Sequence, residues 1–395
     1  MLSTLKPSPI GVLQRQTTVL PVIDSPSSNG LKVPSTTALQ KHDLFSDSFP
    51  AQISPMVWTG EDRKGKGDNL FVLNEDEINS IETAVRDFKA TGLELSYLSP
   101  KIFKLPESLA KRLRAVSETL HNGVGYATVR GLDSAKYNDL ENTIIFNGLS
   151  SYIGRLRSTN KKGVSMSHLR DAGRDRKPEN HKHTELNESK LPKSMKFHAD
   201  RFYGDIIAMY VKSDDATGGE QYFASFPYIY NVLAESDPAT LRVLAKDWAW
   251  PNPKENETLP KSPVIFHASN RVIVQLIYRP FVDAGFSSAA EQSALETVQS
   301  LAEKHCVQIE RQAGDLQFFN NLGLLHARNK FQDSSAKGRH MLRLGLRDPE
   351  LAWDLPEEHR EKFDKAFEAK PRSQVIYPTD VDPWDRTTAT TFTHG

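Results

Sequence analysis

The part of the chain after residue 197 is dominated by short apolar segments, and this pattern constrains the fold more than any other. Segments of strand length cover residues 206–211, 220–226, 262–268, 271–278, 307–311, 315–321, 324–329 and 340–347. Helical patterns interrupt them near residues 228–247 and 288–305. Many short strands with a helical insertion are typical of a β-barrel or jelly roll. We therefore expect an α+β protein whose barrel or jelly-roll core is flanked by helices.

Helices are also expected before this strand-rich region. Asn74 and Glu77 have the spacing of a capping box at the start of an amphipathic segment, 75–91, which Gly92 ends. A second amphipathic segment follows Pro106, and "YATVRGL" (126–132) has the composition of a strand. The sequence thus predicts two helices and a strand here.

The two ends of the chain differ in character from its middle. Residues 1–55 are rich in Pro, Ser and Thr without periodicity, which predicts a disordered leader. We expect a single domain over residues 56–370 and a tail over 371–395. The first acidic residue is Asp24, as in a mitochondrial transit peptide, but arginine is scarce before it. A cytoplasmic protein with a plain leader is therefore expected, with a mitochondrial location as the alternative.

Charge, hydropathy and cysteine content exclude several classes of protein. Lys plus Arg and Asp plus Glu both number 50, so no whole-chain field attracts nucleic acid or an anionic membrane. No apolar run approaches the roughly 18 residues of a membrane-spanning helix. The single cysteine, Cys306, excludes an internal disulfide and a thiolate zinc site. A small-molecule partner is expected, and nothing in the sequence indicates an oligomeric state.

The stretch 156–196 is crowded with charged residues and poor in apolar ones. The simpler interpretation is a solvated loop. The functional interpretation is a mobile lid over a neighbouring site. A nucleic-acid surface is a third, but the basic part, 156–177, lacks interleaved aromatic residues.

Three His-x-acid triplets, beginning at His183, His198 and His359, are candidates for metal binding. The first lies in a polar run, and the last has the charge pattern of an exposed helix, on which residues i and i+2 diverge. His198 and Asp200 instead lead into the apolar segment 206–211. On an extended segment the two side chains project to the same side, so they could share one ion.

A tight site needs a third ligand, which a later histidine must supply. His326 stands between two strand-like segments. His340 and His267 are its rivals, and each of the three could equally be a histidine of the core.

The motifs taken together resemble one family. "FHAD" (197–200), "GGEQYFAS" (218–225), "GDLQFFNNLGLLHAR" (314–328) and "GRHMLRLGLRD" (338–348) look like the TauD/TfdA family of Fe(II)/2-oxoglutarate oxygenases. The resemblance covers roughly residues 120–350. It implies a double-stranded β-helix (jelly-roll, cupin-like) core and an Fe(II) held by His198, Asp200 and His326. Such a 2-His-1-carboxylate face leaves positions for oxygen and a chelating 2-oxo acid.

The segment from Arg339 to Arg347 alternates with period two. Arg339, Arg343 and Gly345 lie on one face, and three leucines with a histidine lie on the other. A cationic face suits a strand that binds an anion in a barrel lumen, while plain exposure to solvent is the alternative. The resemblance implies that Arg339 binds the distal carboxylate of 2-oxoglutarate. It also implies that Arg343 reaches the cosubstrate or an anionic group of the substrate.

Three further residues are candidates for the site. Gln221 stands where many family members have a threonine that binds 2-oxoglutarate, and its amide can donate a hydrogen bond as a hydroxyl does. Gly345 leaves room on the lumen face and, with Asn321 and Arg343, completes the expected substrate contacts.

The resemblance implies an oxygenase that uses O2 and 2-oxoglutarate to oxidise an unactivated C–H bond and releases succinate and CO2. Hydroxylation, desaturation and cyclisation all remain open. Arg343 favours a small carboxylate-bearing substrate, such as an amino acid. One alternative is a cosubstrate-independent cupin-like metal protein, against which Arg339 argues. The other is a non-catalytic protein with the same fold, which the absence of the usual threonine leaves open.

Overall fold

The computed structural model describes residues 49–380, apart from positions 174, 176–178, 180–185, 253–256 and 335–337. All described residues belong to one unit, residues 43–395. Most of the expected leader, the triplet at His183 and residues 381–395 of the expected tail lie outside the described residues.

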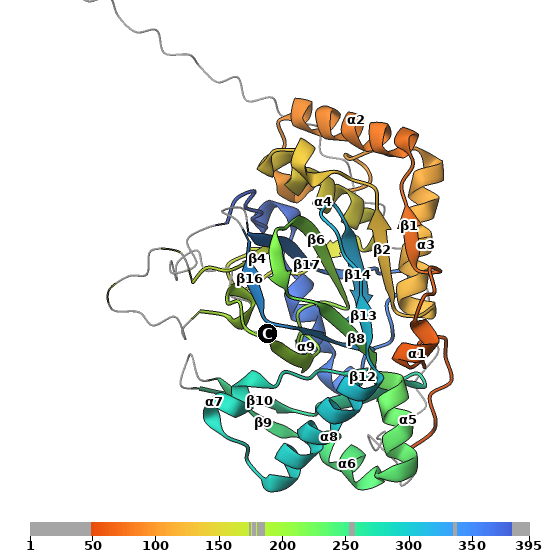
Figure 1. Cartoon of the computed structure of the whole chain (residues 1–395), viewed down its shortest axis with the longest axis vertical. Coiled ribbons are helices and arrows are strands. Elements are labelled where there is room, and N and C mark those ends of the chain that lie inside the picture. The colour runs from red at the N-terminus through yellow and green to blue at the C-terminus, as the bar shows by residue number, and fades with distance from the viewer. Residues whose placement is uncertain are drawn as a thin grey trace, which may run out of the picture. The chain divides into compact units, whose positions relative to one another are not determined.

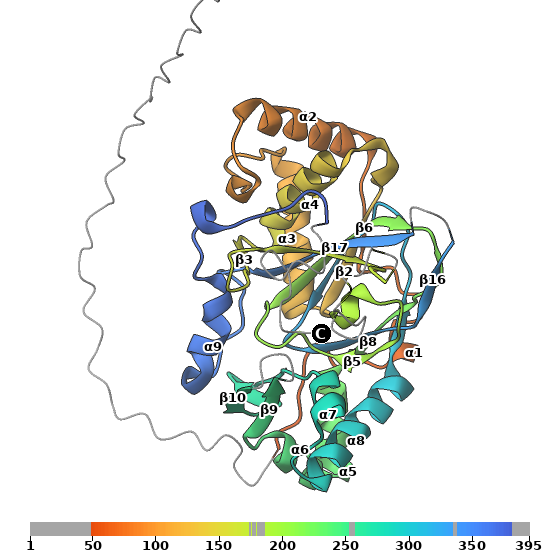
Figure 2. The same ribbon diagram turned by 90° about the vertical axis from the view of Figure 1, so that its left-hand side faces the viewer.

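Two β-sheets form the centre of the described chain (Figures 1 and 2). The larger has the order β1-β2-β14-β6-β17-β3, with β4 also paired to β17, and the smaller has the order β13-β8-β15-β5. The strands of the larger sheet are β1 (Leu70–Val72), β2 (Tyr126–Arg130), β3 (Leu156–Arg157), β4 (Met166–Arg170), β6 (Ile206–Asp214), β14 (Leu316–Asn320) and β17 (Arg339–Arg347). Those of the smaller sheet are β5 (Met195–His198), β8 (Gln221–Ser225), β13 (Val307–Ile309) and β15 (Leu324–Arg328).

The two sheets pack face to face through aromatic side chains. Phe223 of the smaller sheet contacts Phe319 of the larger one, with ring centroids 4.7 Å apart, and also contacts Tyr126 at 5.4 Å. These rings belong to one buried cluster with residues of both sheets. The architecture is therefore the expected jelly roll with flanking helices. Next to it, β7 (Ala216–Gly218) pairs with β16 (Phe331–Asp333).

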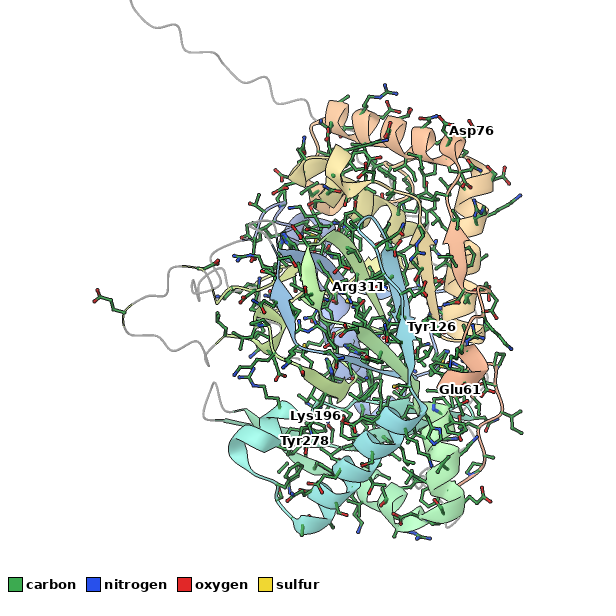
Figure 3. All side chains as sticks on the ribbon, viewed as in Figure 1. Glu61, Asp76, Tyr126, Lys196, Tyr278 and Arg311 are labelled. Atoms are coloured by element: carbon green, nitrogen blue, oxygen red, sulfur yellow. The ribbon has the colours of Figure 1, made fainter. Side chains whose placement is uncertain are left out.

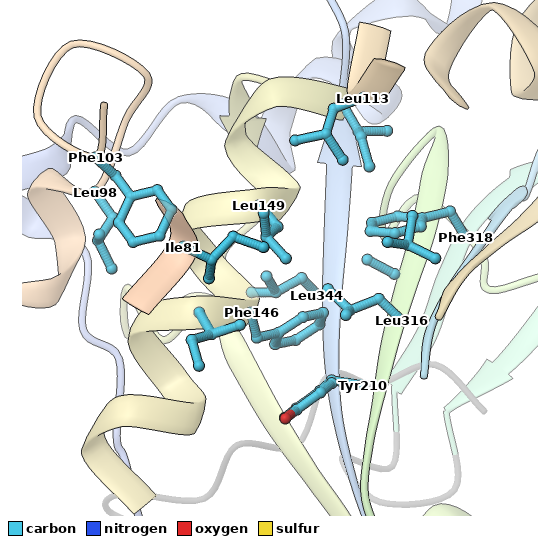
Figure 4. Packing of buried hydrophobic residues seen from close by; sticks show 14 of the residues in the cluster. Ile81, Leu98, Phe103, Leu113, Phe146, Leu149, Tyr210, Leu316, Phe318 and Leu344 are labelled. Atoms are coloured by element: carbon cyan, nitrogen blue, oxygen red, sulfur yellow. The ribbon is translucent and has the colours of Figure 1, made fainter. Parts of the chain in front are cut away.

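Helices cover the outer face of the larger sheet. They are α2 (Glu75–Thr91), α3 (Glu107–Asn122) and α4 (Asp139–Ile153). Figure 4 shows Phe146 and Leu149 of α4 directed at Leu316 and Leu344 of the strands. Because α4 is buried on almost every side, it has no polar stripe, and the sequence interpretation missed it. Its capping box, Asn138 with Glu141, is the signal that could have located its start.

The outer face of the smaller sheet is covered by the segment that joins β8 to β13 (green to cyan in Figure 1). This segment comprises α5 (Phe226–Ser236), α6 (Pro238–Leu244), α7 (Arg279–Ala284), α8 (Ala289–His305) and the hairpins β9 (Trp248–Asn252) with β10 (Glu257–Ser262) and β11 (Ile265–Ala268) with β12 (Arg271–Val274). The helical region expected over 228–247 consists of two helices, α5 and α6. They are separate because Pro238 begins α6 and the side chain of Asp237 caps its first turn. Among the described residues no helix has the length and apolar character needed to cross a bilayer.

Strand β17 has the alternation that the sequence predicts. Leu342, Leu344 and Leu346 pack into the helix-covered cluster, whereas Met341 lies in the cluster between the sheets. The alternating arginines therefore project between the sheets, where a guanidinium group needs a partner.

The charged stretch 156–196 is not one continuous loop. It contains β3, β4, the 3-10 turn Glu188–Lys190 and β5, and β4 pairs with β17 over five residues, His340↔Arg170 to Leu344↔Met166. Two of its charged residues, Arg170 and Lys190, pair with the distant Asp380, which local composition cannot reveal. Two contacts attach segments near the ends of the described chain. The backbone of the buried Gln52 forms hydrogen bonds with the side-chain amide of Asn231, and Val375 forms an isolated β-bridge with Val164.

Candidate metal centre and its cavity

Three of the predicted residues lie together on the inner side of the smaller sheet. His198 ends β5 and His326 lies in β15, and the two are paired directly across the strands. Their ring centroids are 4.0 Å apart, and His198 Nε2 lies 3.9 Å from Asp200 Oδ1. One ligand atom from each residue falls within 4.8 Å of the others, and no other group of three metal-binding side chains was found in the described residues. The sequence prediction thus selected the one set that the fold brings together.

The hydrogen bonds of these residues leave atoms free for a cation. His198 Nδ1 lies 2.8 Å from the Lys196 carbonyl, which indicates that Nδ1 carries the proton and Nε2 a lone pair. Within the described part of the chain, His198 Nε2, Asp200 Oδ1 and His326 Nδ1 are buried without a hydrogen-bond partner. Burying polar atoms unpaired is unfavourable, and a divalent cation would satisfy them. The donor set of two imidazoles and one carboxylate fits Fe(II).

The electrostatic environment keeps the histidine of β15 neutral. Burial lowers the pKa of His326 well below its usual value, and the nearby His198 and Arg343 add to the shift. A neutral imidazole is the form that binds metal ions.

Asn321, expected to contact substrate, instead holds the backbone of Asp200. Its Oδ1 accepts from the Asp200 N–H at 2.8 Å, and its Nδ2 donates to the carbonyls of Asp200 and Gly204 at 2.7 and 2.8 Å. The side chain is fully buried and does not line the cavity described below. We therefore assign Asn321 to positioning the carboxylate rather than to binding a substrate.

A cavity between the two sheets joins the triad to the predicted arginines. Its lining includes His198, His326, Gln221, Arg328, Arg339 and Arg343. Arg339 is 2% exposed, and its Nε and Nη1 have no hydrogen-bond partner among the described residues. Burial, together with the charges of Arg328 and Arg311, lowers the pKa of Arg339 well below its usual value. A buried guanidinium in this state creates a binding site for an anion.

The turn at Gly218 and Gly219 lies against this guanidinium. A Cβ at Gly219 would be 3.5 Å from Arg339 Nε, and the residue has a positive φ of 75°. Arg311, labelled in Figure 3, holds the turn in place, since it pairs with Asp214 at 2.9 Å and donates to the Gly219 carbonyl at 2.5 Å. Gln221 follows the turn, and its Oε1 is buried without a described partner. The donor of this amide, Nε2, makes only a weak contact with Met209 Sδ at 3.8 Å, so it can donate to a molecule in the cavity.

Arg343 and Arg347 differ in role although they share a strand. Arg343 lines the cavity and donates from Nη1 to Asp200 Oδ2 at 3.0 Å, while its Nε has no described partner. Burial is the largest single influence on Arg343 and opposes its charge, but the Asp200 carboxylate and Tyr203 together outweigh it and raise the pKa of Arg343. Arg347 instead binds Asp205 at 2.6 Å and Asp364, outside the cavity.

Gly345 does not leave room for a substrate as expected. A Cβ there would be 2.6 Å from the Tyr203 carbonyl oxygen and closer still to Ser158 Oγ. The absent side chain is needed for the close approach of the neighbouring backbone, and Gly345 does not line the cavity.

The rival histidines lie elsewhere. His340 faces away from the cavity and pairs with His168, Nε2 to Nδ1, at 2.9 Å. His267 lies in β11, and His359 ends the 3-10 turn Glu357–His359 beside α9 (Arg360–Asp364).

The sequence interpretation missed one cavity residue, Arg328, which lines the cavity from β15. Its position two residues after His326 was the available signal, because i and i+2 of a strand share a side.

Comparison with known proteins agrees with this geometry. The family model "Taurine catabolism dioxygenase TauD, TfdA family" matches residues 89–344. The chain belongs to the TauD/TfdA family. Taurine hydroxylase-like protein SAT17 of Stachybotrys chartarum is 34% identical over 328 residues, which cover 79% of this chain and 84% of the relative. FR-33289 synthase of Streptomyces rubellomurinus is 25% identical, with 73% and 88% covered.

Solved structures share the fold of this TauD/TfdA chain. Asparagine oxygenase in complex with Fe(II), 2S,3S-3-hydroxyasparagine and succinate matches with a TM-score of 0.55 at 14% identity, covering 71% of this chain and 94% of the other. The non-heme iron oxygenase OrfP with Fe and alpha-ketoglutaric acid matches with a TM-score of 0.53 at 13% identity, covering 70% and 93%. The protein is an Fe(II)/2-oxoglutarate-dependent oxygenase, with both as its cofactors, as the sequence motifs predicted.

Proposed function

We propose that this enzyme oxidises an unactivated C–H bond of a small carboxylate-bearing molecule, with Fe(II) held by His198, Asp200 and His326. The iron and its bound 2-oxoglutarate supply the activation of oxygen. In hydroxylation, substrate, O2 and 2-oxoglutarate give the alcohol, succinate and CO2, with one oxygen atom in succinate and the other in the alcohol. In desaturation or cyclisation two hydrogens leave the substrate, and the second oxygen atom leaves as water.

The state of Arg339 carries this proposal. Its guanidinium is buried in the same cavity as the triad, has two unpartnered nitrogens and lies beside the cations Arg328 and Arg311. A carboxylate bound in a bidentate manner would satisfy it. We propose that Arg339 holds the distal carboxylate of 2-oxoglutarate and that Gln221, next to the Gly218–Gly219 turn, donates to the same group.

The remaining lining suits a small acid with an alkyl part. Arg343 has donors left after binding Asp200, and we propose that these meet an anionic group of the substrate. Leu169, Ile207, Met209 and Phe223 provide an apolar wall beside them. The amino acids named in the asparagine oxygenase and OrfP complexes are small acids of this kind, and one relative carries the name taurine hydroxylase-like protein. We place the enzyme in the cytoplasm, because its single cysteine, Cys306, fits a reducing compartment.

Anaerobic titration with Fe(II) and 2-oxoglutarate tests the assignment. The wild-type protein should develop the charge-transfer absorption of an Fe(II)–2-oxo acid chelate, and Asp200→Ala and His326→Ala should not. Arg339→Met should retain Fe(II) binding but weaken 2-oxoglutarate binding by about 100-fold, as expected for losing charge-assisted hydrogen bonds to a buried group. In air, succinate release should follow the same order. Unchanged succinate release in Asp200→Ala would refute the metal assignment.

The same titration identifies the substrate class. Small amino and carboxylic acids added to the wild-type chelate should perturb the absorption band when they bind next to the iron. At Fe(II) and 2-oxoglutarate concentrations that saturate the variant, Arg343→Gln should still weaken that response. An equal response in the variant would contradict the proposed role of Arg343 toward the substrate.

A further inference from the structure

Two walls of the cavity come from neighbouring segments of the charged stretch. Leu169 of β4 and Ser189 of the turn Glu188–Lys190 both line the cavity. The residue after each of them, Arg170 and Lys190, binds one and the same carboxylate, that of Asp380. The side chain of Asp380, the last described residue, therefore connects the two walls through residues that adjoin the cavity lining.

The geometry of this ion cluster is tight and largely hidden from solvent. Lys190 Nζ lies 2.8 and 2.9 Å from the two oxygens of Asp380, and Arg170 Nε lies 2.6 Å from Oδ2. The side chains of Lys190 and Asp380 are 8% and 6% exposed. Burial lowers the pKa of Lys190, and Asp380 opposes that shift. Removing the carboxylate would leave a buried ammonium without a counter-charge, which is strongly destabilising for that contact.

The two cations depend on Asp380 to different degrees. Arg170 also makes a bidentate pair with Asp175 at 2.8 and 2.6 Å, so it keeps a partner if Asp380 is lost. For Lys190 the structure shows an ion pair with Asp380 alone among the described residues. Loss of Asp380 should therefore release the Ser189 wall more than the Leu169 wall.

The segment that carries Asp380 is itself attached to β4. Val375 forms a bridge with Val164, and the Tyr377 carbonyl lies 2.9 Å from His168 Nε2. These contacts bring residues 375–380 alongside β4, beyond residue 344, where the match to the family model ends. Residues 375–380 thus lie outside the matched residues, whereas the strand that they contact lies within them.

We propose that Asp380 is a positioning residue of the active site, which fixes Ser189 and Leu169 at the cavity through Lys190 and Arg170. The proposal rests on the proposed function in one respect, namely that 2-oxoglutarate occupies this cavity. Asp380 itself does not line the cavity, so its effect on a bound cosubstrate reaches it only through the two walls.

A set of variants of the full chain separates this role from general stability. Asp380→Asn should weaken binding of 2-oxoglutarate to the Fe(II) protein on the order of tenfold, because a displaced wall loosens the site. It should also raise hydrogen exchange at residues 186–191. Lys190→Met should have a similar effect, and Asp380→Asn with Lys190→Met should be no worse than Asp380→Asn alone, because both changes break the same contact. Asp175→Asn is the matched control, because it removes a partner of Arg170 but not of Lys190, and it should leave both readouts at the wild-type level.

The outcomes are distinguishable. If Asp380→Asn lowers only the melting temperature, with 2-oxoglutarate affinity and exchange at 186–191 unchanged, the positioning role is refuted. A double variant whose loss equals the sum of the two single losses would refute it as well, because the two residues would then act independently. If the wild-type protein binds Fe(II) but not 2-oxoglutarate, the proposed function fails instead, and the exchange measurement still decides whether Asp380 holds the Ser189 wall.

Discussion

Arg343 donates from Nη1 to Oδ2 of Asp200 at 3.0 Å, which leaves Oδ1 as the oxygen without a described partner. The arginine therefore selects which oxygen faces the metal position. Ligand carboxylates are commonly oriented by such partners, whose loss weakens metal binding.

We expect Arg343→Met to reduce Fe(II) affinity by about 10- to 100-fold. Calorimetric titration under anaerobic conditions measures this directly. Arg347→Met is the control, because Arg347 pairs with Asp205 and Asp364 outside the cavity. That variant should unfold more easily yet bind Fe(II) normally, and a loss of metal affinity in both variants alike would contradict the specific role of Arg343.

Asn321→Ala should act on the metal site rather than on the cosubstrate. The change leaves the Asp200 N–H and two carbonyls without their amide partner, which should lower the free energy of unfolding by about 2 kcal/mol. Fe(II) affinity should fall as Asp200 loses its support, while 2-oxoglutarate affinity at saturating Fe(II) should not. Denaturant unfolding and the two titrations check these expectations. A change confined to substrate or cosubstrate binding would restore the sequence-based assignment.

Gly345→Ala should destabilise the protein by about 1–3 kcal/mol, since the new Cβ meets the Tyr203 carbonyl and Ser158 Oγ. Gly67→Ala provides the comparison, because a Cβ at that position meets nothing within 4 Å. Urea unfolding of the two variants should differ accordingly. If Gly345→Ala were as stable as Gly67→Ala and merely rejected a larger substrate, the glycine would be a substrate contact after all.

Stability should fall as the solution becomes acidic. Burial lowers the pKa of His168 to about 4 and that of His340 well below its usual value. These histidines are neutral in the folded protein, whereas in the unfolded chain they take up protons below about pH 6.5. Each therefore removes up to about 1.4 kcal/mol of stability per pH unit from pH 6.5 down to its folded pKa, and none above pH 6.5. Unfolding measured from pH 7.5 to 5 should show the decline, and His340→Gln should make it shallower.

The metal triad could be predicted because its signal is local. Asp200 follows His198 by two residues just after the end of β5 and lies beside it, as expected for an extended segment, and the flanking motifs selected His326. The alternation of β17 likewise placed Arg339 and Arg343 between the sheets. In each case the spacing of residues within a short stretch of sequence determines on which side of the chain they lie.

The roles of Asn321 and Gly345 could not be predicted in this way. Asn321 acts on a backbone segment more than 110 positions away, and Gly345 is constrained by Ser158 and Tyr203. Strand β4 was missed for the same reason, since its partner is the distant strand β17, with Arg170 opposite His340. Long-range pairing of this kind leaves no local pattern.

The two histidines of the triad and Arg339, the proposed partner of 2-oxoglutarate, belong to different sheets of the jelly roll. His198 and His326 lie in the smaller sheet, and Arg339 lies in the larger. Their separation is therefore set by the rings packed between the sheets, among them Phe223 and Phe319. A substitution at these rings would alter the reach of a bound dicarboxylate between iron and guanidinium without touching either. A small change in the distance between the sheets should consequently lower the catalytic rate more than it lowers the stability of the fold.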